Sequence, residues 1–254
     1  MGGALAEGLL SNGWRAPDLI VAEHNAQRSA WARDHLQVSV FADPAEAARN
    51  AKTVLLAVKP QDIDSVMKSM VQSLTPHALV ISIAAGVRID TMQKVFGERP
   101  VIRAMPNTPA AIAMGATALA KGTHATDTHL VTALNIFGCV GRTVVVGEDQ
   151  MDAVTAVSGT GPAYVFLLAE ALIDAAQAEG LSQEQAYALT YQTFAGAARL
   201  LTHDPASPAE LRRRVTSPNG TTHAAMTHLE ENRWVQVFRD AVQVARQRSE
   251  ELGS

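Results

Sequence analysis

The sequence predicts a doubly wound α/β domain followed by an all-helical domain. In the first half of the chain, short apolar runs alternate with helical patterns. Strands buried on both faces of a sheet read as continuous apolar runs, and helices that link such strands indicate a parallel sheet. From about residue 148 onward helical patterns follow one another without a strand pattern. We therefore place the α/β domain at residues 1–147 and the helical domain at residues 148–254.

The elements of the first domain follow from these runs. Strands are expected at residues 19–22, 53–58, 79–83, 101–105, 117–120 and 143–146. Helices are expected at residues 4–10, 45–50, 63–74 and 89–96, with another that runs through residue 135. The last two strands are open to an antiparallel arrangement, which the sequence leaves undecided.

The second domain is expected to hold long helices with wide apolar faces. The predicted helices are residues 165–179, 182–202, 223–231 and 235–252. Pro162 and Gly180 bound the first of them, and Ser182 with Gln185 three residues later forms a capping-box pattern for the second. Wide apolar faces favour burial against a second subunit over an independent bundle.

Composition excludes several classes of protein. The 254 residues are 47% hydrophobic and 18% charged, which is typical of globular proteins. The net charge is −4 and the basic residues are scattered apart from residues 212–214, so no nucleic-acid partner is expected. No apolar run reaches the roughly 20 residues that span a bilayer, and residues 1–5 lack the basic start of a secretory signal. We expect a cytoplasmic protein that does not bind membranes.

The sequence gives little support for a metal site or for a hydrolase. The eight histidines lack ligand spacing, and the single cysteine, Cys139, cannot form an internal disulfide or a cysteine-rich metal site. No Gly-x-Ser-x-Gly elbow occurs, and Ser158 has no evident histidine partner. We therefore expect no metal.

Three loops follow predicted strands and favour a cofactor groove. Residues 57–60 (Ala-Val-Lys-Pro), 83–86 (Ile-Ala-Ala-Gly) and 105–109 (Met-Pro-Asn-Thr-Pro) each begin where a strand ends. The carboxyl ends of parallel strands meet at one edge of a sheet, where ligands bind. Small side chains in the second loop allow a flat ring to approach the backbone.

Two glycine-rich segments precede helices in the second domain. These segments are residues 158–162 (Ser-Gly-Thr-Gly-Pro) and 216–222 (Thr-Ser-Pro-Asn-Gly-Thr-Thr). A helix start of this kind presents free backbone N–H groups, which suit a carboxylate or phosphate. A helix start that is merely capped is the alternative.

The order and spacing of five segments resemble the pyrroline-5-carboxylate reductases over essentially the whole chain. The segments are residues 57–60, 82–86, 103–109, 158–166 and 215–222, the last being the family signature. The resemblance implies a Rossmann-type domain followed by a helical dimerisation domain, and dimers that often assemble into decamers. Asn219 stands where glycine is usual, and asparagine tolerates the same left-handed conformations.

The resemblance also implies a reaction and roles for residues. Hydride passes from NADPH or NADH to the imine carbon of Δ1-pyrroline-5-carboxylate, which gives L-proline. The substrate-binding candidates are Val215, Ser217, Gly220, Thr221, Thr222 and Glu148, with Thr222 as the catalytic candidate at the ring nitrogen. The cofactor-binding candidates are Gly2, His24, Asn25, Val58, Lys59, Ala84, Ala85, Met105 and Asn107.

Residues after the strand at 19–22 should set the choice of cofactor. The carboxylate of Glu23 suits a ribose 2′-hydroxyl and repels a 2′-phosphate, whereas His24, Asn25 and Arg28 favour the phosphate. We expect NADPH, with NADH tolerated.

The family pattern begins earlier than this sequence does. Its members open with a strand and a G-x-G-x-x-G turn, and here Met1 stands at the fifth position of that turn and Gly2 at the third glycine. The first strand and the first two glycines have no counterpart in this sequence. We therefore expect a shortened form of a longer protein or a weakened enzyme.

Two alternatives stay open at this point. One is a non-catalytic, oligomeric relative without tight cofactor binding. The other is a different imine or β-hydroxyacid reductase, which would need a catalytic lysine or aspartate in the first long helix of the second domain. That helix offers Glu170 and Asp174 but no lysine.

Overall fold

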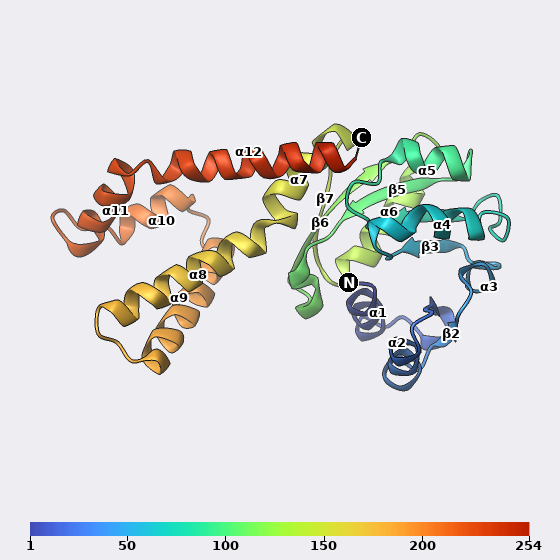
Figure 1. The fold of residues 1–254 in the computed structure, drawn as a ribbon, viewed down its shortest axis with the longest axis horizontal. Helices are drawn as coiled ribbons and strands as arrows, with labels where there is room; N and C mark the ends of the chain where they lie inside the picture. Colours follow the sequence, from blue (N-terminus) through green and yellow to red (C-terminus); the bar gives the residue numbers. More distant parts are fainter. Residues whose placement is uncertain (254) are drawn as a thin grey trace. The chain divides into compact units, whose positions relative to one another are not determined.

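The chain forms two compact units in the computed structural model, which describes residues 1–253 (Figure 1). The first unit is Met1–Thr160 together with Ala245–Ser254, and the second is Gly161–Val244. The boundary predicted between residues 147 and 148 marks where the strand pattern ends, and it stays a prediction. Residue 254, the last of the predicted helical domain, lies outside the described residues.

The sheet of the first unit is in two parts. A five-stranded sheet has the order β3 (Thr53–Leu56), β4 (Leu79–Ser82), β5 (Val101–Met105), β6 (Gly115–Lys121) and β7 (Gly141–Val145). A separate parallel pair consists of β1 (Ile20–Ala22) and β2 (Ser39–Phe41). Strands β3 to β5 are parallel, β6 is antiparallel to β5, and β7 is parallel to β6. The last two strands therefore run opposite to the others, which answers the question that the sequence left open.

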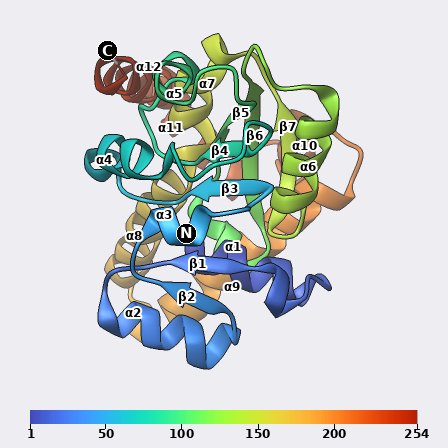
Figure 2. The ribbon, with the colours of Figure 1, turned by 90° about the vertical axis from the view of Figure 1, so that its right-hand side faces the viewer.

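Helices cover both faces of this sheet (Figure 2). The helices of the first unit are α1 (Gly2–Ser11), α2 (Ala26–Trp31), α3 (Pro44–Ala48), α4 (Pro60–Met70), α5 (Ile89–Phe96), α6 (Asp127–Gly138), α7 (Met151–Val154) and the end of α12 (Trp234–Leu252). Short 3₁₀ or π turns are η1 (Ala16–Asp18), η2 (Ala32–Leu36), η3 (Thr108–Ile112), η4 (Glu148–Gln150) and η5 (Thr155–Gly159). Helices α2 and α7 and strand β2 were not predicted from the sequence; a strand of three residues is too short to show an alternation.

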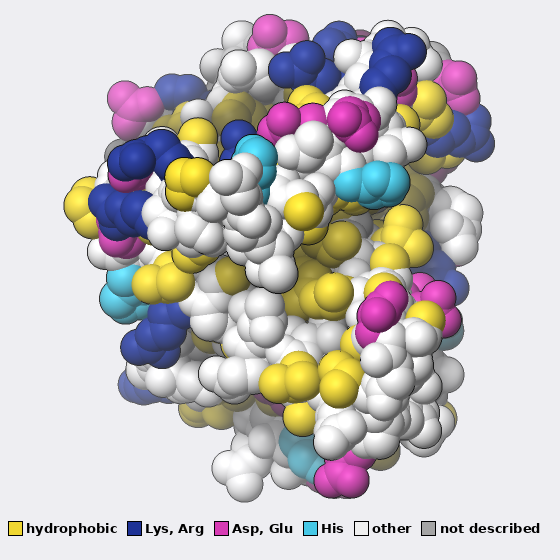
Figure 3. All heavy atoms as spheres, turned by 90° about the vertical axis from the view of Figure 1, so that its left-hand side faces the viewer, with side chains coloured by type: hydrophobic (Ala, Val, Ile, Leu, Met, Phe, Trp, Pro, Cys, Tyr) yellow, Lys and Arg dark blue, Asp and Glu magenta, His cyan; other side chains and the backbone are white. Residues whose placement is uncertain are grey.

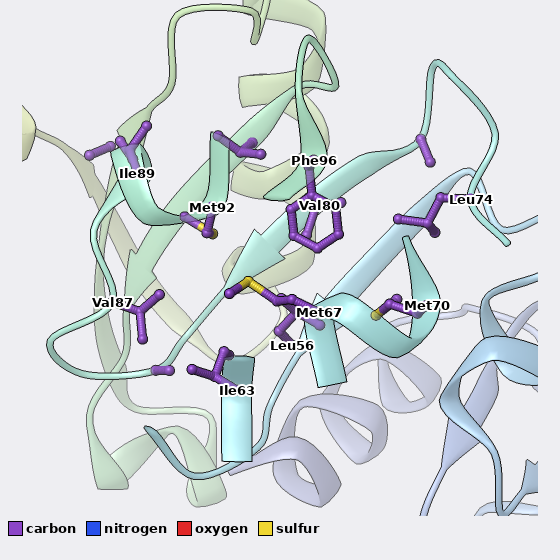
Figure 4. Packing of buried hydrophobic residues seen from close by; sticks show 14 of the residues in the cluster. Leu56, Ile63, Met67, Met70, Leu74, Val80, Val87, Ile89, Met92 and Phe96 are labelled. Carbon is purple, nitrogen blue, oxygen red and sulfur yellow. The ribbon is translucent and has the colours of Figure 1, made fainter. Parts of the chain in front are cut away.

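Two apolar cores hold the sheet and its helices together. On one face, Met67 of α4 and Met92 and Phe96 of α5 point toward Val80 of β4 (Figure 4). On the other face, α1 and α6 pack against β4, β5 and β6. In α4 the buried residues Ile63, Met67 and Met70 recur at helical spacing, which is why one side of that helix faces the core. The rigid sheet between these layers positions the loops at its edge.

The second unit is helical throughout. It contains α8 (Gly161–Ala178), α9 (Gln183–His203), α10 (Pro208–Arg214), α11 (Thr221–Glu231) and the first part of α12. Ser182 and Gln185 form the predicted capping box at the start of α9. Helix α10 was not predicted as a separate helix. Helix α8 buries no residue, and apolar side chains lie uncovered at the surface (Figure 3).

One helical stretch has the length and composition of a membrane span. Residues 148–178 form a continuous helical segment of this kind, and it is hardly buried. No such segment was expected from the sequence, in which no uninterrupted apolar run reaches about 20 residues. A helix that packs against another subunit has the same composition.

Candidate functional site

Three of the predicted loops begin at one edge of the five-stranded sheet. Leu56 of β3 pairs with Ser82 of β4, and Ser82 pairs with Arg103 of β5. Because these strands are parallel and in register, residues 57–60, 83–86 and 105–109 all leave the sheet at the same edge. The structure thus brings Val58, Ala85 and Met105 to the same edge of one unit.

The start of α1 lies beside the first of these loops. A β-carbon placed on Gly2 would lie 3.1 Å from the β-carbon of Ala57, so only a small residue fits there. No side chain caps α1, and its first N–H groups have no acceptor within the helix. Free N–H groups and the positive end of the helix dipole suit a phosphate. Lys59 is exposed at the end of the same loop and adds a positive charge.

Ala84 and Ala85 have different surroundings. Ala84 is buried in the core, and its N–H donates to the Ser82 hydroxyl at 3.2 Å. Ala85 is only partly buried. Of the two candidates, Ala85 therefore offers the surface that a flat ring can approach.

The side chain of Asn107 ties the third loop to the rest of the first unit. Its Nδ2 donates to the carbonyl of Ser158 at 3.0 Å, and its Oδ1 accepts from the N–H of Ala116 at 2.8 Å. Met105 lies against Gly159, where an added β-carbon would be 2.7 Å from the Met105 methyl. Asn107 therefore shapes the loop, and Met105 offers its side chain at the loop surface.

The glycine-rich residues 158–162 do not form the expected helix start with free N–H groups. Thr155–Gly159 form one π-helical turn, η5, between α7 and α8. The N–H and the hydroxyl of Thr160 both donate to the carbonyl of Thr155, at 2.8 and 3.0 Å. The N–H of Thr160 is therefore not free to bind an anion, and α8 continues a preceding helix. Glycine and hydroxyl residues suit a loop or a π turn equally, so the sequence held no signal that separates them.

The carboxylate of Glu23, after β1, is already paired. Glu23 Oε2 lies 3.2 Å from Arg28 Nε, and Oε1 accepts from the N–H of Asn25 at 2.9 Å. Asn25 caps α2 by accepting from the N–H of Arg28 at 3.0 Å. His24 is exposed, with Nδ1 3.8 Å from Glu23. The predicted residues for cofactor choice therefore form one group in which Glu23 and Arg28 restrain each other.

Glu148 belongs to a cluster of charges around a buried arginine. The side chain of Arg103 is only 4% exposed, and its guanidinium lies 3.4 Å from Glu148 and 4.0 Å from Asp152. Glu148 Oε1 also accepts from the N–H of Ile89 at 2.6 Å, which stabilises the start of α5. A cavity of about 460 Å³ is lined by Arg88, Arg103, Glu148, Asp149, Asp152 and Glu250. Arg103 and Asp152 were not among the predicted site residues, because nothing in the neighbouring sequence shows that a charged side chain is buried.

Apart from Glu148, which belongs to the first unit, the substrate candidates lie in the second unit, from the end of α10 to the start of α11. Asn219 has φ of 58°, the left-handed conformation expected of the residue that replaces glycine. Gly220 is the N-cap residue of α11 and provides no side-chain cap, and its N–H donates to the carbonyl of Ser217 at 3.1 Å. The free N–H groups of Thr221 and Thr222 suit a carboxylate.

The side chains around this helix start differ in exposure. Val215 is exposed and presents an apolar surface, whereas Thr222 is partly buried. Among residues 1–253, no three histidine, cysteine, aspartate or glutamate side chains lie close enough together to hold a metal ion.

Two protein families match the chain. Residues 148–252 match the pyrroline-5-carboxylate reductase dimerisation family, and residues 1–86 match the family described as NADP oxidoreductase, coenzyme F420-dependent. A pyrroline-5-carboxylate reductase of Pseudomonas aeruginosa is 40% identical over 254 residues, which is 99% of this chain and 93% of the relative.

Solved structures of pyrroline-5-carboxylate reductases from other organisms are also similar to this chain. A pyrroline-5-carboxylate reductase from Coxiella burnetii has a TM-score of 0.94 at 36% identity, over 100% of this chain and 95% of that one. One from Plasmodium falciparum with NADP bound has a TM-score of 0.88 at 29% identity, again over 100% and 95% of the two chains.

Proposed function

The chain belongs to the pyrroline-5-carboxylate reductase family, and from this premise we propose that it reduces Δ1-pyrroline-5-carboxylate to L-proline with NADPH or NADH. The observation that carries the proposal is the similarity to curated reductases over 99% of the chain, because it includes both compact units. This reaction is the last step of proline biosynthesis. The alternatives of a β-hydroxyacid reductase and of a non-catalytic relative have no comparable support.

The first unit is the part that binds the cofactor. When bound, the nicotinamide cofactor supplies the hydride. The N–H groups at the start of α1 would hold its pyrophosphate, and Val58 and Lys59 would lie near its ribose or phosphates. Ala85 and Met105 would flank the nicotinamide ring, while Ala84 and Asn107 shape the two loops from behind.

The second unit supplies the groups for the substrate. The N–H groups of Thr221 and Thr222 would bind the carboxylate, and Val215 would pack against the ring. The imine carbon gains a hydride, the electron pair of the C=N bond moves to nitrogen, and the nitrogen ends protonated. The Thr222 hydroxyl would orient this nitrogen and stabilise its protonated form. Ser217 and Gly220 hold the turn that presents these groups.

The assembly and location follow from the uncovered apolar helices of the second unit. We propose that a second copy of the chain covers them, and that such dimers assemble further into decamers. The same contact would cover residues 148–178, so the protein would stay in the cytoplasm without entering membranes. We expect no nucleic-acid partner, because the net charge is −4.

The activity can be tested by following the absorbance of NADPH with purified protein. Oxidation is expected only when pyrroline-5-carboxylate is added, and proline should appear in equal amount. Parallel reactions with 2-keto acids, and with 3-hydroxy acids and NADP⁺, serve as controls. Turnover of those acids without turnover of the imine would refute the proposal.

A further inference from the structure

The end of α12 packs against the loop that carries Ala84 and Ala85. Gly86 has φ of 76°, and a β-carbon placed on it would lie 2.8 Å from the carbonyl oxygen of Leu252. A β-carbon placed on Gly253 would lie 3.2 Å from the carbonyl oxygen of Gly86 and 3.2 Å from Arg88 Nε. The backbone at the end of α12 therefore packs directly against the backbone at Gly86, and a shift of the helix end would move the loop.

A partly buried hydrogen bond holds the end of α12 in place. Ser249 is 4% exposed, and its Oγ donates to Asp152 Oδ1 at 2.7 Å. Asp152 Oδ2 lies 3.9 Å from Arg88 Nη2, and Arg88 is the residue that precedes α5. Asp152 thus connects the helix end to the residue where the 83–88 loop finishes.

The loop has few bonds of its own that could fix its shape. Within it, the N–H of Val87 donates to Ala84 at 3.4 Å, and the N–H of Ala84 donates to Ser82 at 3.2 Å. Both distances are at or beyond the long end of the usual range for hydrogen bonds. The conformation of residues 84–87 therefore depends on the groups that pack around it.

We propose that Ser249 is a positioning residue for cofactor binding, which acts through Asp152 and the end of α12 on the Ala84–Gly86 backbone. This inference rests on the proposed function, since that function assigns the loop to the nicotinamide. Ser249 itself needs no contact with the cofactor. Its loss should loosen the loop and weaken NADPH binding, and leave substrate binding at the start of α11 unchanged.

Three variants test this role. Ser249→Ala removes the hydroxyl, Ser249→Thr keeps it, and Gln247→Ala changes an exposed residue of the same helix as the matched control. NADPH affinity is measured directly by fluorescence titration, and KM for pyrroline-5-carboxylate is measured at saturating NADPH. We expect Ser249→Ala to raise the NADPH Kd about three- to tenfold with an unchanged KM for the imine. Ser249→Thr and Gln247→Ala should keep the wild-type Kd.

Two results would overturn the proposal. One is an NADPH Kd for Ser249→Ala within twofold of the wild type. The other is an equal rise in the NADPH Kd and in the KM for the imine, which would indicate general loosening. A melting curve of each variant identifies any that fails to fold. If Ser249→Ala does not fold, Asp152→Asn replaces it, because it keeps an acceptor for Ser249 but removes the charge near Arg88. Its NADPH Kd should then exceed the wild-type value while the KM for the imine stays unchanged, and a wild-type Kd would overturn the proposal. The titration needs no turnover, so a wild type that binds NADPH but leaves the imine unreduced would refute only the proposed function.

Discussion

The two compact units have similarly apolar sequences but bury them very differently. In the first unit, large side chains such as Phe96, Phe137 and Met92 are fully buried in cores on the two faces of the sheet. In the second unit, only Ala186 and Thr190 are buried among residues 161–244. Phe166, Leu167 and many similar side chains of α8 to α12 stay exposed.

This difference shows that an apolar helix face in the sequence does not reveal whether the same chain or another subunit covers it. The first unit completes its cores within itself, because a sheet lies between two layers of helices. The second unit has no sheet among residues 161–244, so the apolar faces of its helices stay exposed to solvent. Large exposed apolar surfaces on a folded protein mark an interaction site, and the match to a dimerisation family indicates a second copy.

The largest expected effect comes from adding a strand to the sheet of the first unit, where buried and open strands can be compared. Strand β4 is buried throughout, whereas β3 is an edge strand and β1 pairs only with β2. In the usual doubly wound order, one more parallel strand fits between β1 and β3. Adding about ten residues before Met1, an apolar strand and a Gly-x-Gly turn, should bury several side chains worth about 1.5–3 kcal/mol each.

We therefore expect the extended protein to melt at a temperature several degrees higher and to bind NADPH at least about tenfold more tightly. The measurements are thermal unfolding and NADPH titration of both forms. Hydrogen exchange should show the gain in β1 and β3 and little change in α9. If the two forms have equal melting temperatures and equal affinities for NADPH, the open edges of β1 and β3 lower neither stability nor cofactor binding.

A matched pair of phenylalanines tests the comparison between the units. Phe96 is 1% exposed in the first unit, and Phe166 is 60% exposed in the second. Phe96→Ala should lower the free energy of unfolding by about 3–5 kcal/mol at every protein concentration, because it leaves a cavity. Phe166→Ala should lower the melting temperature mainly in dilute protein, because it weakens the contact between subunits.

Thermal unfolding over a hundredfold range of protein concentration separates the two cases, and analytical ultracentrifugation follows the assembly. If Phe166→Ala destabilises the protein to the same extent at all concentrations, the exposed face is not an interface between subunits.

The third prediction concerns chemistry in the second unit. Thr222→Val keeps the shape of the side chain but removes the hydroxyl at the start of α11. The turnover number should fall, by up to about 100-fold if the hydroxyl assists proton transfer, because the proposed function assigns the ring nitrogen to this hydroxyl. NADPH affinity should stay at the wild-type value, since the cofactor loops belong to the first unit.

Steady-state kinetics and a separate NADPH titration check this split. Thr227→Val is the matched control, since Thr227 is exposed on the same helix. An unaltered kcat/KM for Thr222→Val would show that the Thr222 hydroxyl takes no part in the reaction.

The smallest expected effect lies in the first unit. Glu23→Ser frees Arg28 from its ion pair, so the guanidinium can approach a 2′-phosphate. The preference for NADPH over NADH, measured as the ratio of kcat/KM values, should rise about two- to fivefold. Glu7→Ser, a change of an exposed acid on α1, should leave the ratio unchanged. A ratio that does not move in Glu23→Ser would assign cofactor choice to other residues.

The sequence predicted those elements whose pattern is local. Continuous apolar runs located β3 to β7, and helix α5 was predicted with its observed bounds. The loops after β3, β4 and β5 were predicted at one edge of the sheet, because parallel strands end together. The missed elements, β2, α2, α7 and α10, are short, and short segments carry too few residues to show a period.

Other features depended on contacts between residues far apart in the sequence. The amino-acid sequence by itself determined the family, from five segments spread along the chain, and the order of the longer elements, from local apolar patterns. It also indicated the left-handed turn at Asn219, which depends on residues close together in the chain. Only the tertiary structure decided that Glu148 pairs with the buried Arg103, that Asn107 is held by Ser158 and Ala116, and that Ser249 reaches Asp152. A polar side chain looks the same in a sequence whether it meets water, ligand or protein. Its role is decided by the partners that folding brings within hydrogen-bond distance.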